Sequence, residues 1–207
     1  MSGFEATIAA IDAANATDPR QDAGAPFETV YAARMSDCLA ELYPEASELL
    51  KIAARAQHLR RWEIARSAYP EGRKGYNDWR RACREHHARL AGDIMRAQGY
   101  DAAAIAHVGG LIRKEQLKKD PESQALENVA AVVFLEHYFD DFLTKYAAYP
   151  DDKIVDILGK TLCKMSPRGH AAALALPLDA RARSLVAAAV TREAAALERL
   201  AAVACDA

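Results

Sequence analysis

The sequence predicts an all-α protein folded as a helical bundle. Its 207 residues are rich in alanine and poor in β-branched residues, a composition that favours helix over strand. Apolar residues also recur at three- and four-residue spacings along most of the chain, as on the buried face of a helix. With 51% hydrophobic and 27% charged residues, the chain is unlike a disordered protein and long enough for one core. We therefore expect a single domain over residues 1–207.

Three helices are expected in the first part of the chain. They cover residues 4–15, 27–43 and 46–61. Pro19 and Pro44 follow the first two, and a helix normally stops before a proline because the residue preceding it avoids helical backbone angles. The next segment, 62–75, is dense in proline, glycine and tyrosine, so we expect a long loop there.

Five further helices follow this loop. They cover residues 76–98, 101–116, 122–146, 151–163 and 179–204. Gly99 suits the end of the first, because glycine readily adopts the left-handed conformation after a helix. Asp101 suits the N-cap of the second, and Pro121 suits the start of the third. Residues 164–178 are expected as a loop, and no segment has the alternating pattern of a strand.

The sequence predicts a cytoplasmic protein with no membrane segment. The N-terminal residues 1–16 are too acidic and too interrupted for a signal peptide. No stretch approaches the roughly 18 apolar residues of a membrane span. The four cysteines, Cys38, Cys83, Cys163 and Cys205, form no CxxC pair, which is typical of reduced thiols. We expect Cys83, on an apolar helical stripe, to be a core residue.

Charge is distributed unevenly along the chain. The formal net charge of -2 argues against a general nucleic-acid binder. Residues 55–89, however, hold ten basic and four acidic side chains, together with both tryptophans. Arginines interleaved with aromatic rings suit a small phosphorylated or otherwise anionic molecule, because guanidinium binds phosphate bidentately and rings stack on bases. The alternative is a solvated basic face whose aromatic residues hold a loop to the core.

Eleven residues are the candidates for binding this anion. They are Arg60, Arg61, Trp62, Arg66, Tyr69, Arg73, Tyr76, Trp79, Arg80, Lys114 and Arg168. Lys114 belongs to a second basic cluster, 113–119. Arg168 lies in the segment Ser-Pro-Arg-Gly at 166–169, which is interpreted mainly as a turn with Ser166 as N-cap and Pro167 at the first helical position.

Two histidines are candidates for proton transfer. His58 is expected at the C-terminal end of helix 46–61, where the helix dipole favours imidazolium; bound to a metal it would be neutral. His87 continues an apolar stripe, and His86 fits that stripe nearly as well, so the sequence does not decide which points inward. The alternative for each is a core histidine with one satisfied hydrogen bond.

Glu136 is the acidic candidate. It lies next to the apolar stripe of the predicted helix 122–146, so we expect a partly buried carboxylate that needs a partner. That partner is either an arginine of the basic segment or a divalent metal, which His58, His87 and Glu136 would then hold. Glu127 is a second candidate at the same face.

The sequence resembles an uncharacterised bacterial and fungal family known as a domain of unknown function. The resemblance covers nearly the whole chain and implies no particular chemistry. It rests on the motifs Gln57-His58-Leu59-Arg60-Arg61-Trp62, Tyr69-Pro70-Glu71-Gly72-Arg73, Gly75-Tyr76, Trp79-Arg80, His87, Gly99-Tyr100, Leu126-Glu127, Phe134-Leu135-Glu136 and Met165-Ser166-Pro167-Arg168-Gly169.

The helix order more distantly resembles the HD superfamily of metal-dependent phosphohydrolases. This resemblance implies an HD-like core at 26–148 with a C-terminal helical extension at 151–207. Tyr31, Gln57 and Asn128 stand where that superfamily has metal ligands. A phenol and two amides are poor ligands for a divalent metal, so this likeness implies either a degenerate site or a rebuilt one.

Two functions follow as expectations. One is a pocket that binds a small anionic metabolite, such as a nucleotide, and hydrolyses a phosphoester; His58 or His87 then moves the proton, and Glu136 orients water or a metal. The other is a non-catalytic HD-like module that senses a ligand or docks a protein. Helix 179–204 packs either internally or across a homodimer, and the sequence allows both.

Overall fold

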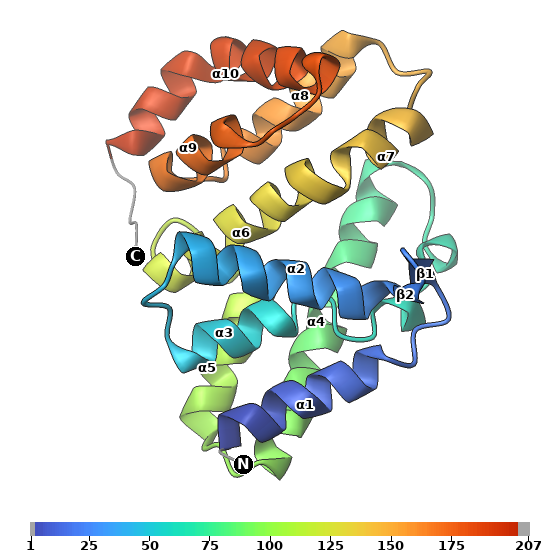
Figure 1. The fold of residues 1–207 in the computed structure, drawn as a ribbon, viewed down its shortest axis with the longest axis vertical. Helices are drawn as coiled ribbons and strands as arrows, with labels where there is room; N and C mark the ends of the chain where they lie inside the picture. The colour runs from blue at the N-terminus through green and yellow to red at the C-terminus, as the bar shows by residue number, and fades with distance from the viewer. Residues whose placement is uncertain (1–2, 203–207) are drawn as a thin grey trace. The chain divides into compact units, whose positions relative to one another are not determined.

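The computed structural model describes residues 3–202, and almost all of its regular structure is helical (Figure 1). The all-α prediction is confirmed. The chain forms two compact units, one up to Glu115 and one from Gln116 onward. This boundary falls within the segment 26–148 that the HD resemblance treats as one core. Of the expected residues, Ala204 of the last helix and Cys205 lie outside the described part of the chain.

The first unit contains five α-helices, two 3-10 turns and a minimal hairpin. Its elements are α1 (Gly3–Asn15), β1 (Gln21–Asp22), β2 (Ala25–Pro26), α2 (Phe27–Leu42), α3 (Glu48–Arg55), η1 (Arg61–Glu63), η2 (Arg66–Ala68), α4 (Gly72–Ala97) and α5 (Ala102–Arg113). The two strands pair antiparallel. Helix α4 packs along α5, α3 packs on both α2 and α5, and α1 contacts α2, α3 and α4. The unit therefore has one core, lined by residues such as Ile11, Met35 and Ile52.

Side-chain caps account for several helix starts in this unit. Ser47 Oγ accepts a hydrogen bond from Leu50 N at 3.1 Å, and Asp101 Oδ1 accepts one from Ala104 N at 2.8 Å. Each cap satisfies a backbone N–H that the first turn leaves unpaired. The predicted cap at Asp101 is thus confirmed.

The second unit is entirely helical within the described residues. Its elements are α6 (Pro121–His137), α7 (Phe139–Lys145), α8 (Asp151–Leu162), α9 (Pro167–Ala175) and α10 (Ala180–Ala201). Helix α8 packs along α10, and α6 packs against α9 and α7. Apolar residues such as Leu158, Leu185 and Val186 are buried in this unit.

Several expected elements differ in the structure. Helix α4 begins at Gly72, inside the loop expected at 62–75, and residues 21–26 form a short hairpin where no strand is expected. The helix predicted at 46–61 ends at Arg55, and tight turns follow it. The helix predicted at 122–146 is interrupted at Tyr138, which leaves helical geometry at φ -130° and ψ -3°. Part of the predicted loop 164–178 is helix α9, which begins at Pro167. Local periodicity does not detect such breaks, because they depend on contacts with distant residues.

Gly75, in the basic segment, is required by the close approach of the chain at Pro70. A β-carbon at this position would lie 1.9 Å from the carbonyl oxygen of Pro70. Only glycine therefore lets the chain before α4 turn back so closely over the first turns of that helix. Within residues 3–202, no helix is long and apolar enough to cross a membrane.

Candidate functional site

His58 lies in the turns that follow α3, not at a helix end. Helix α3 ends at Arg55, and Arg60 adopts a left-handed conformation with φ 51°. The backbone N–H of Arg60 donates to Asn15 Oδ1 at 3.0 Å. This contact from α1 turns the chain out of the helix. As a result the His58 side chain enters the first unit and is only 23% exposed.

Tyr31 and His87 flank the ring of His58. The Tyr31 phenol stacks on it with a centroid distance of 3.9 Å and an interplanar angle of 11°. The ring of His87 lies 5.9 Å away. Tyr31 and His87 are both buried, at 7% and 1% exposure. The structure therefore brings together two of the three residues predicted to be catalytic.

His87, not His86, is the inward histidine. His87 Nδ1 lies 2.8 Å from the carbonyl oxygen of Leu59, so this nitrogen carries the hydrogen and donates it. His86 is half-buried, and its Nε2 lies 3.0 Å from Glu63 Oε2. The choice that periodicity left open is settled by the tertiary fold.

Burial and nearby positive charge keep His58 neutral. Burial lowers the pKa of His58 well below its ordinary value, and the charges of Arg61, Lys114, Arg80 and Arg20 lower it further. Both effects disfavour imidazolium. The expectation of a charged His58 at a helix C-terminus is therefore wrong, because the helix ends three residues earlier. Burial also lowers the pKa of His87 well below its ordinary value, and His58 adds to this.

A buried carboxylate, Glu28, completes the group. Glu28 is fully buried on α2, and its Oε2 lies 3.4 Å from His58 Nδ1. Its other oxygen accepts a hydrogen bond from Arg20 Nη2 at 2.6 Å. Burial raises the pKa of Glu28, and Arg20 opposes that rise. We call Glu28, Tyr31, His58 and His87 the histidine cluster.

Sequence reasoning missed Glu28. The signal was present, because Glu28, Tyr31 and Met35 follow one another at three- and four-residue spacings on the buried side of α2. A carboxylate on an apolar stripe needs a partner. Its partner Arg20 comes from the hairpin region, where no regular periodicity indicates proximity.

Within residues 3–202, several buried polar atoms of the histidine cluster form no hydrogen bond, and two of them, Glu28 Oε2 and His58 Nδ1, face each other at 3.4 Å. The atoms without a hydrogen bond are Glu28 Oε2, His58 Nδ1 and His87 Nε2, and Gln57 Oε1 is another such atom beside His58 in the chain. Most buried polar atoms in proteins are paired. A concentration of unpaired ones within one cluster is typical of a place where a ligand or water binds.

Arg61 and Arg80 stack on aromatic rings close to the cluster. The guanidinium carbon of Arg61 lies 4.6 Å from the ring centre of Trp79, and that of Arg80 lies 5.9 Å from the ring centre of Tyr76. The two rings are 5.7 Å apart, and Trp79 Nε1 donates to the carbonyl oxygen of Ile64 at 2.8 Å. Within residues 3–202, neither arginine forms a salt bridge, although the charge of Arg61 acts on the buried carboxylate of Glu28.

Most of the other residues predicted to bind the anion differ from Arg61 and Arg80 in their contacts. Arg60 is paired with Glu63, and Arg66 Nη1 donates to the Tyr69 carbonyl oxygen at 2.8 Å. Trp62 and Tyr69 are half-buried. Lys114 follows α5 in a left-handed conformation with φ 63°. Its charge acts on His58, so it belongs with Arg61 and Arg80.

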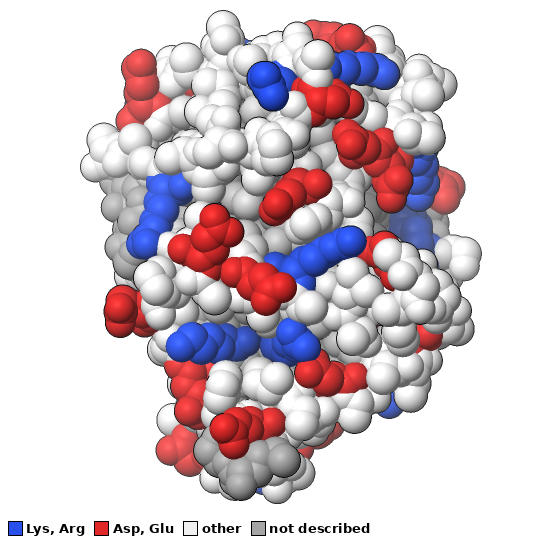
Figure 2. Space-filling view, in the orientation of Figure 1, with Lys and Arg blue, Asp and Glu red and all other residues white. Residues whose placement is uncertain are grey.

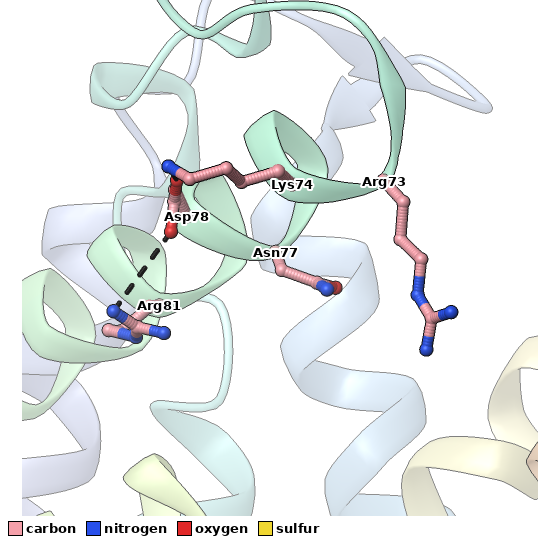
Figure 3. A pocket seen from close by; sticks show the side chains of 5 residues that line it. All are labelled: Arg73, Lys74, Asn77, Asp78 and Arg81. Carbon is pink, nitrogen blue, oxygen red and sulfur yellow. Dashed lines mark hydrogen bonds and ion pairs between the residues drawn. The ribbon is translucent and has the colours of Figure 1, made fainter.

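Arg73 lies beside a separate, open hollow on α4 (Figure 3). The hollow measures about 630 Å³ and is lined by Arg73, Lys74, Asn77, Asp78 and Arg81. Lys74 and Arg81 turn toward Asp78, at 2.9 and 4.0 Å, while Arg73 points away from them. All five residues come from one exposed helix face, so the hollow lacks the opposing walls of a ligand pocket.

Glu136 is not the partly buried carboxylate that the sequence predicts. It belongs to the second unit, its side chain is 38% exposed, and its Oε2 lies 3.5 Å from His137 Nε2. Glu136 lies in the last turn of α6, where Val132, Val133 and Leu135 are buried and Glu136 is not. Glu127, the second candidate, is buried at 7% exposure.

The residues present do not fit a metal of the HD type. Among residues 3–202, no three His, Cys, Asp or Glu side chains are grouped to hold a metal ion. Tyr31 covers one face of His58, where the HD resemblance would place a ligand. His87 Nδ1 already donates a hydrogen bond to the carbonyl oxygen of Leu59.

Asn128 of α6 is hydrogen-bonded to the Ser-Pro-Arg-Gly segment at the start of α9. We call this contact between Asn128 and residues 166–169 the joint between α6 and α9. Asn128 Oδ1 accepts from Ser166 N at 3.0 Å, and its Nδ2 donates to Ser166 Oγ at 2.8 Å. Ser166 precedes α9 as predicted, but its hydroxyl pairs with Asn128 rather than capping the helix. Arg168 is exposed on this helix. The segment therefore holds α9 to α6.

Basic and acidic side chains are interspersed over the face shown in Figure 2. No single-sign patch of the kind that binds nucleic acid covers it. Some cations of residues 55–89 form surface ion pairs, such as Lys74–Asp78, and the charges of Arg61 and Arg80 act on His58.

The comparisons identify a family but no characterised relative. The family model that describes a "Domain of unknown function (DUF4202)" matches residues 5–186. No curated protein and no solved structure matches the chain.

Proposed function

The chain belongs to the DUF4202 family, whose description assigns no activity, and from the geometry of the histidine cluster we propose that its first unit binds a small phosphorylated or otherwise anionic metabolite. The observation that carries the proposal is the environment of His58. Several positive charges act on its ring, and neither Arg61 nor Arg80 forms a salt bridge within residues 3–202. An anion placed there would gain charge-assisted hydrogen bonds in a partly desolvated site.

A neutral His58 beside several cations also supports phosphoester hydrolysis. A neutral His58 can accept a proton from water as that water attacks phosphorus. The ester P–O bond then breaks, and the departing oxygen takes a proton from solvent. Arg61, Arg80 and Lys114 would offset the negative charge on the phosphoryl oxygens.

The first experiment tests binding. Unfolding of the whole chain is followed with inorganic phosphate, phosphate monoesters and a nucleotide panel. A ligand at a hundred times its dissociation constant should stabilise the fold by about 2.7 kcal/mol. Arg80→Ala should abolish this gain, because it removes a cation near His58. Arg81→Ala is the matched control, since Arg81 is the next residue on α4 but pairs with Asp78 at the surface.

Equal loss in the two variants, or no stabilisation by any of these anions, would contradict the binding proposal. Phosphate release from the same panel, with and without Mg²⁺, Mn²⁺ or Fe²⁺, tests hydrolysis. His58→Gln should lower the rate by about a hundredfold or more, as expected for loss of a general base.

A second candidate is a non-catalytic sensing module with the same ligand class. Tyr31 favours it, because the stacked phenol occupies one face of His58. Binding that depends on Arg80, together with no phosphate release under any metal condition, would support sensing over hydrolysis.

A further inference from the structure

Glu28 is held in place by contacts that leave one of its oxygens for His58. Arg20 Nη2 donates to Oε1 at 2.6 Å and also binds Asp18 Oδ2 at 2.8 Å. The backbone N–H of Glu28 donates to Asp18 Oδ2 at 3.2 Å. Neither Asp18 nor Glu28 has an exposed side chain. The carboxylate of Glu28 is therefore fixed in orientation, with Oε2 directed away from Arg20.

Oε2 of Glu28 and Nδ1 of His58 face each other. They are 3.4 Å apart, and neither atom forms a hydrogen bond with another residue of 3–202. Tyr31, stacked on the imidazole, restricts the ring to this plane. Hydrogen bonds of this kind are often long in the absence of a ligand and shorten when one binds.

The position of the hydrogen on His58 follows from this pairing. The imidazole is neutral, so only one of its nitrogens carries hydrogen. A lone pair on Nδ1 would face a carboxylate oxygen and repel it. Nδ1 is also fully buried, whereas the side chain keeps 23% exposure. The edge that carries Nε2 is thus the accessible one.

We propose that Glu28 is a positioning residue that holds His58 as its Nδ1–H tautomer, so that Nε2 offers a lone pair at the accessible side of the histidine cluster. The use of that lone pair as a proton acceptor rests on the proposed function. The tautomer itself does not, because it is a property of the protein without ligand. This arrangement also gives Glu28 a role beyond its contact with Arg20.

Arg20 makes the substitution Glu28→Gln unusually informative. Arginine has only donors, so Arg20 would select the oxygen of the new amide at the Oε1 position. The amide nitrogen would then face His58 Nδ1 and donate to it. His58 should consequently change to the Nε2–H tautomer, with little change in the shape of the site.

The experiment measures the tautomer by NMR in the full chain labelled with ¹⁵N-histidine, at pH 7.5. Long-range ¹H–¹⁵N couplings distinguish a protonated ring nitrogen from one with a lone pair, and His58→Gln assigns the signal. We expect predominantly Nδ1–H in the wild type and predominantly Nε2–H in Glu28→Gln. Asp12→Asn is the matched control, because it replaces another carboxylate that binds an arginine, Arg55, at 2.6 Å.

The wild-type spectrum alone can overturn the proposal. Predominantly Nε2–H in the wild type would mean that Glu28 donates to His58 or does not act on it. An unchanged tautomer in folded Glu28→Gln would also contradict the inference. Failure of phosphate to bind, with the tautomers as expected, would instead contradict only the proposed function.

Discussion

The buried imidazole of His87 donates from Nδ1 to the Leu59 carbonyl oxygen, and its Nε2 forms no hydrogen bond within the described part of the chain. His58, 5.9 Å away, is surrounded by positive charge. Burial disfavours the protonated form of both rings, and the nearby positive charges disfavour it further at His58. Each residue therefore links the stability of the fold to pH.

The sign of this effect follows from the lowered pKa values of His58 and His87 in the folded protein. The unfolded chain, with ordinary histidine pKa values near 6.5, binds protons more readily. Stability is therefore complete above about pH 6.5 and decreases as the pH falls toward the folded pKa values. Each histidine contributes a slope of about 1.4 kcal/mol per pH unit where only the unfolded state is protonated.

Urea unfolding between pH 7.5 and 5.5 measures this slope. His87→Gln should reduce it by about 1.4 kcal/mol per pH unit, even if the variant is less stable throughout. His107→Gln, at an exposed position on α5, is the control. A slope that His87→Gln leaves intact would show that this histidine binds a proton as readily in the folded protein as in the unfolded chain.

At the scale of elements, the joint between α6 and α9 depends on a small residue. A β-carbon on Gly169 would lie 2.5 Å from Asn128 Oδ1. That oxygen accepts hydrogen bonds from Ser166 N and from Gln124 Nε2. Packing within the second unit thus explains why serine and glycine stand at positions 166 and 169.

Gly169→Ala should destabilise the protein by about 2 kcal/mol or more, because Asn128 must move and leave buried polar groups unpaired. Gly109→Ala is a matched control within a helix. Its new methyl would meet only the end of the flexible Arg113 side chain, at 3.1 Å. Its free energy of unfolding should change by less than about 1 kcal/mol. Equal destabilisation of the two variants would argue against the joint.

At the scale of the molecule, the proposed site belongs to one unit. Glu28, His58, Arg61, Arg80 and Lys114 all precede the boundary at Glu115. Arg168 belongs to the other unit, in a segment whose hydrogen bonds are structural. A formal net charge of -2 for the whole chain conceals this local concentration of cations around His58.

Hydrogen exchange measured with saturating inorganic phosphate should locate the anion. Exchange should slow in peptides that cover residues 55–64 and 76–87. It should not change in peptides that cover 164–176, and Arg80→Ala should abolish the protection. Protection centred on 164–170 would place the anion at Arg168 and contradict the assignment to the first unit.

Local physical chemistry was enough to predict much of the fold. Helical spacing predicted α1, α2 and α8 closely, and the end but not the start of α4. Asp101 and Pro121 marked helix starts because capping and the first turn depend on neighbouring residues. The breaks at Arg55 and Tyr138 were not predictable in this way.

The candidate site was predicted only in part. The histidines and arginines of residues 55–89 were identified by residue type and charge density alone. The role of Glu28 and the exposed state of Glu136 required the tertiary structure, since the helical pattern does not say which distant residues pack against a side chain.

The sequence by itself therefore determined the helical class, most helix boundaries and the segment in which positive charge gathers, because these depend on residues a few positions apart. Only the tertiary structure decided that His87 rather than His86 points inward, that His58 is neutral and that Glu28 faces it. Burial and charge act through space, and the residues responsible, from Asn15 to Lys114, are distant in the chain.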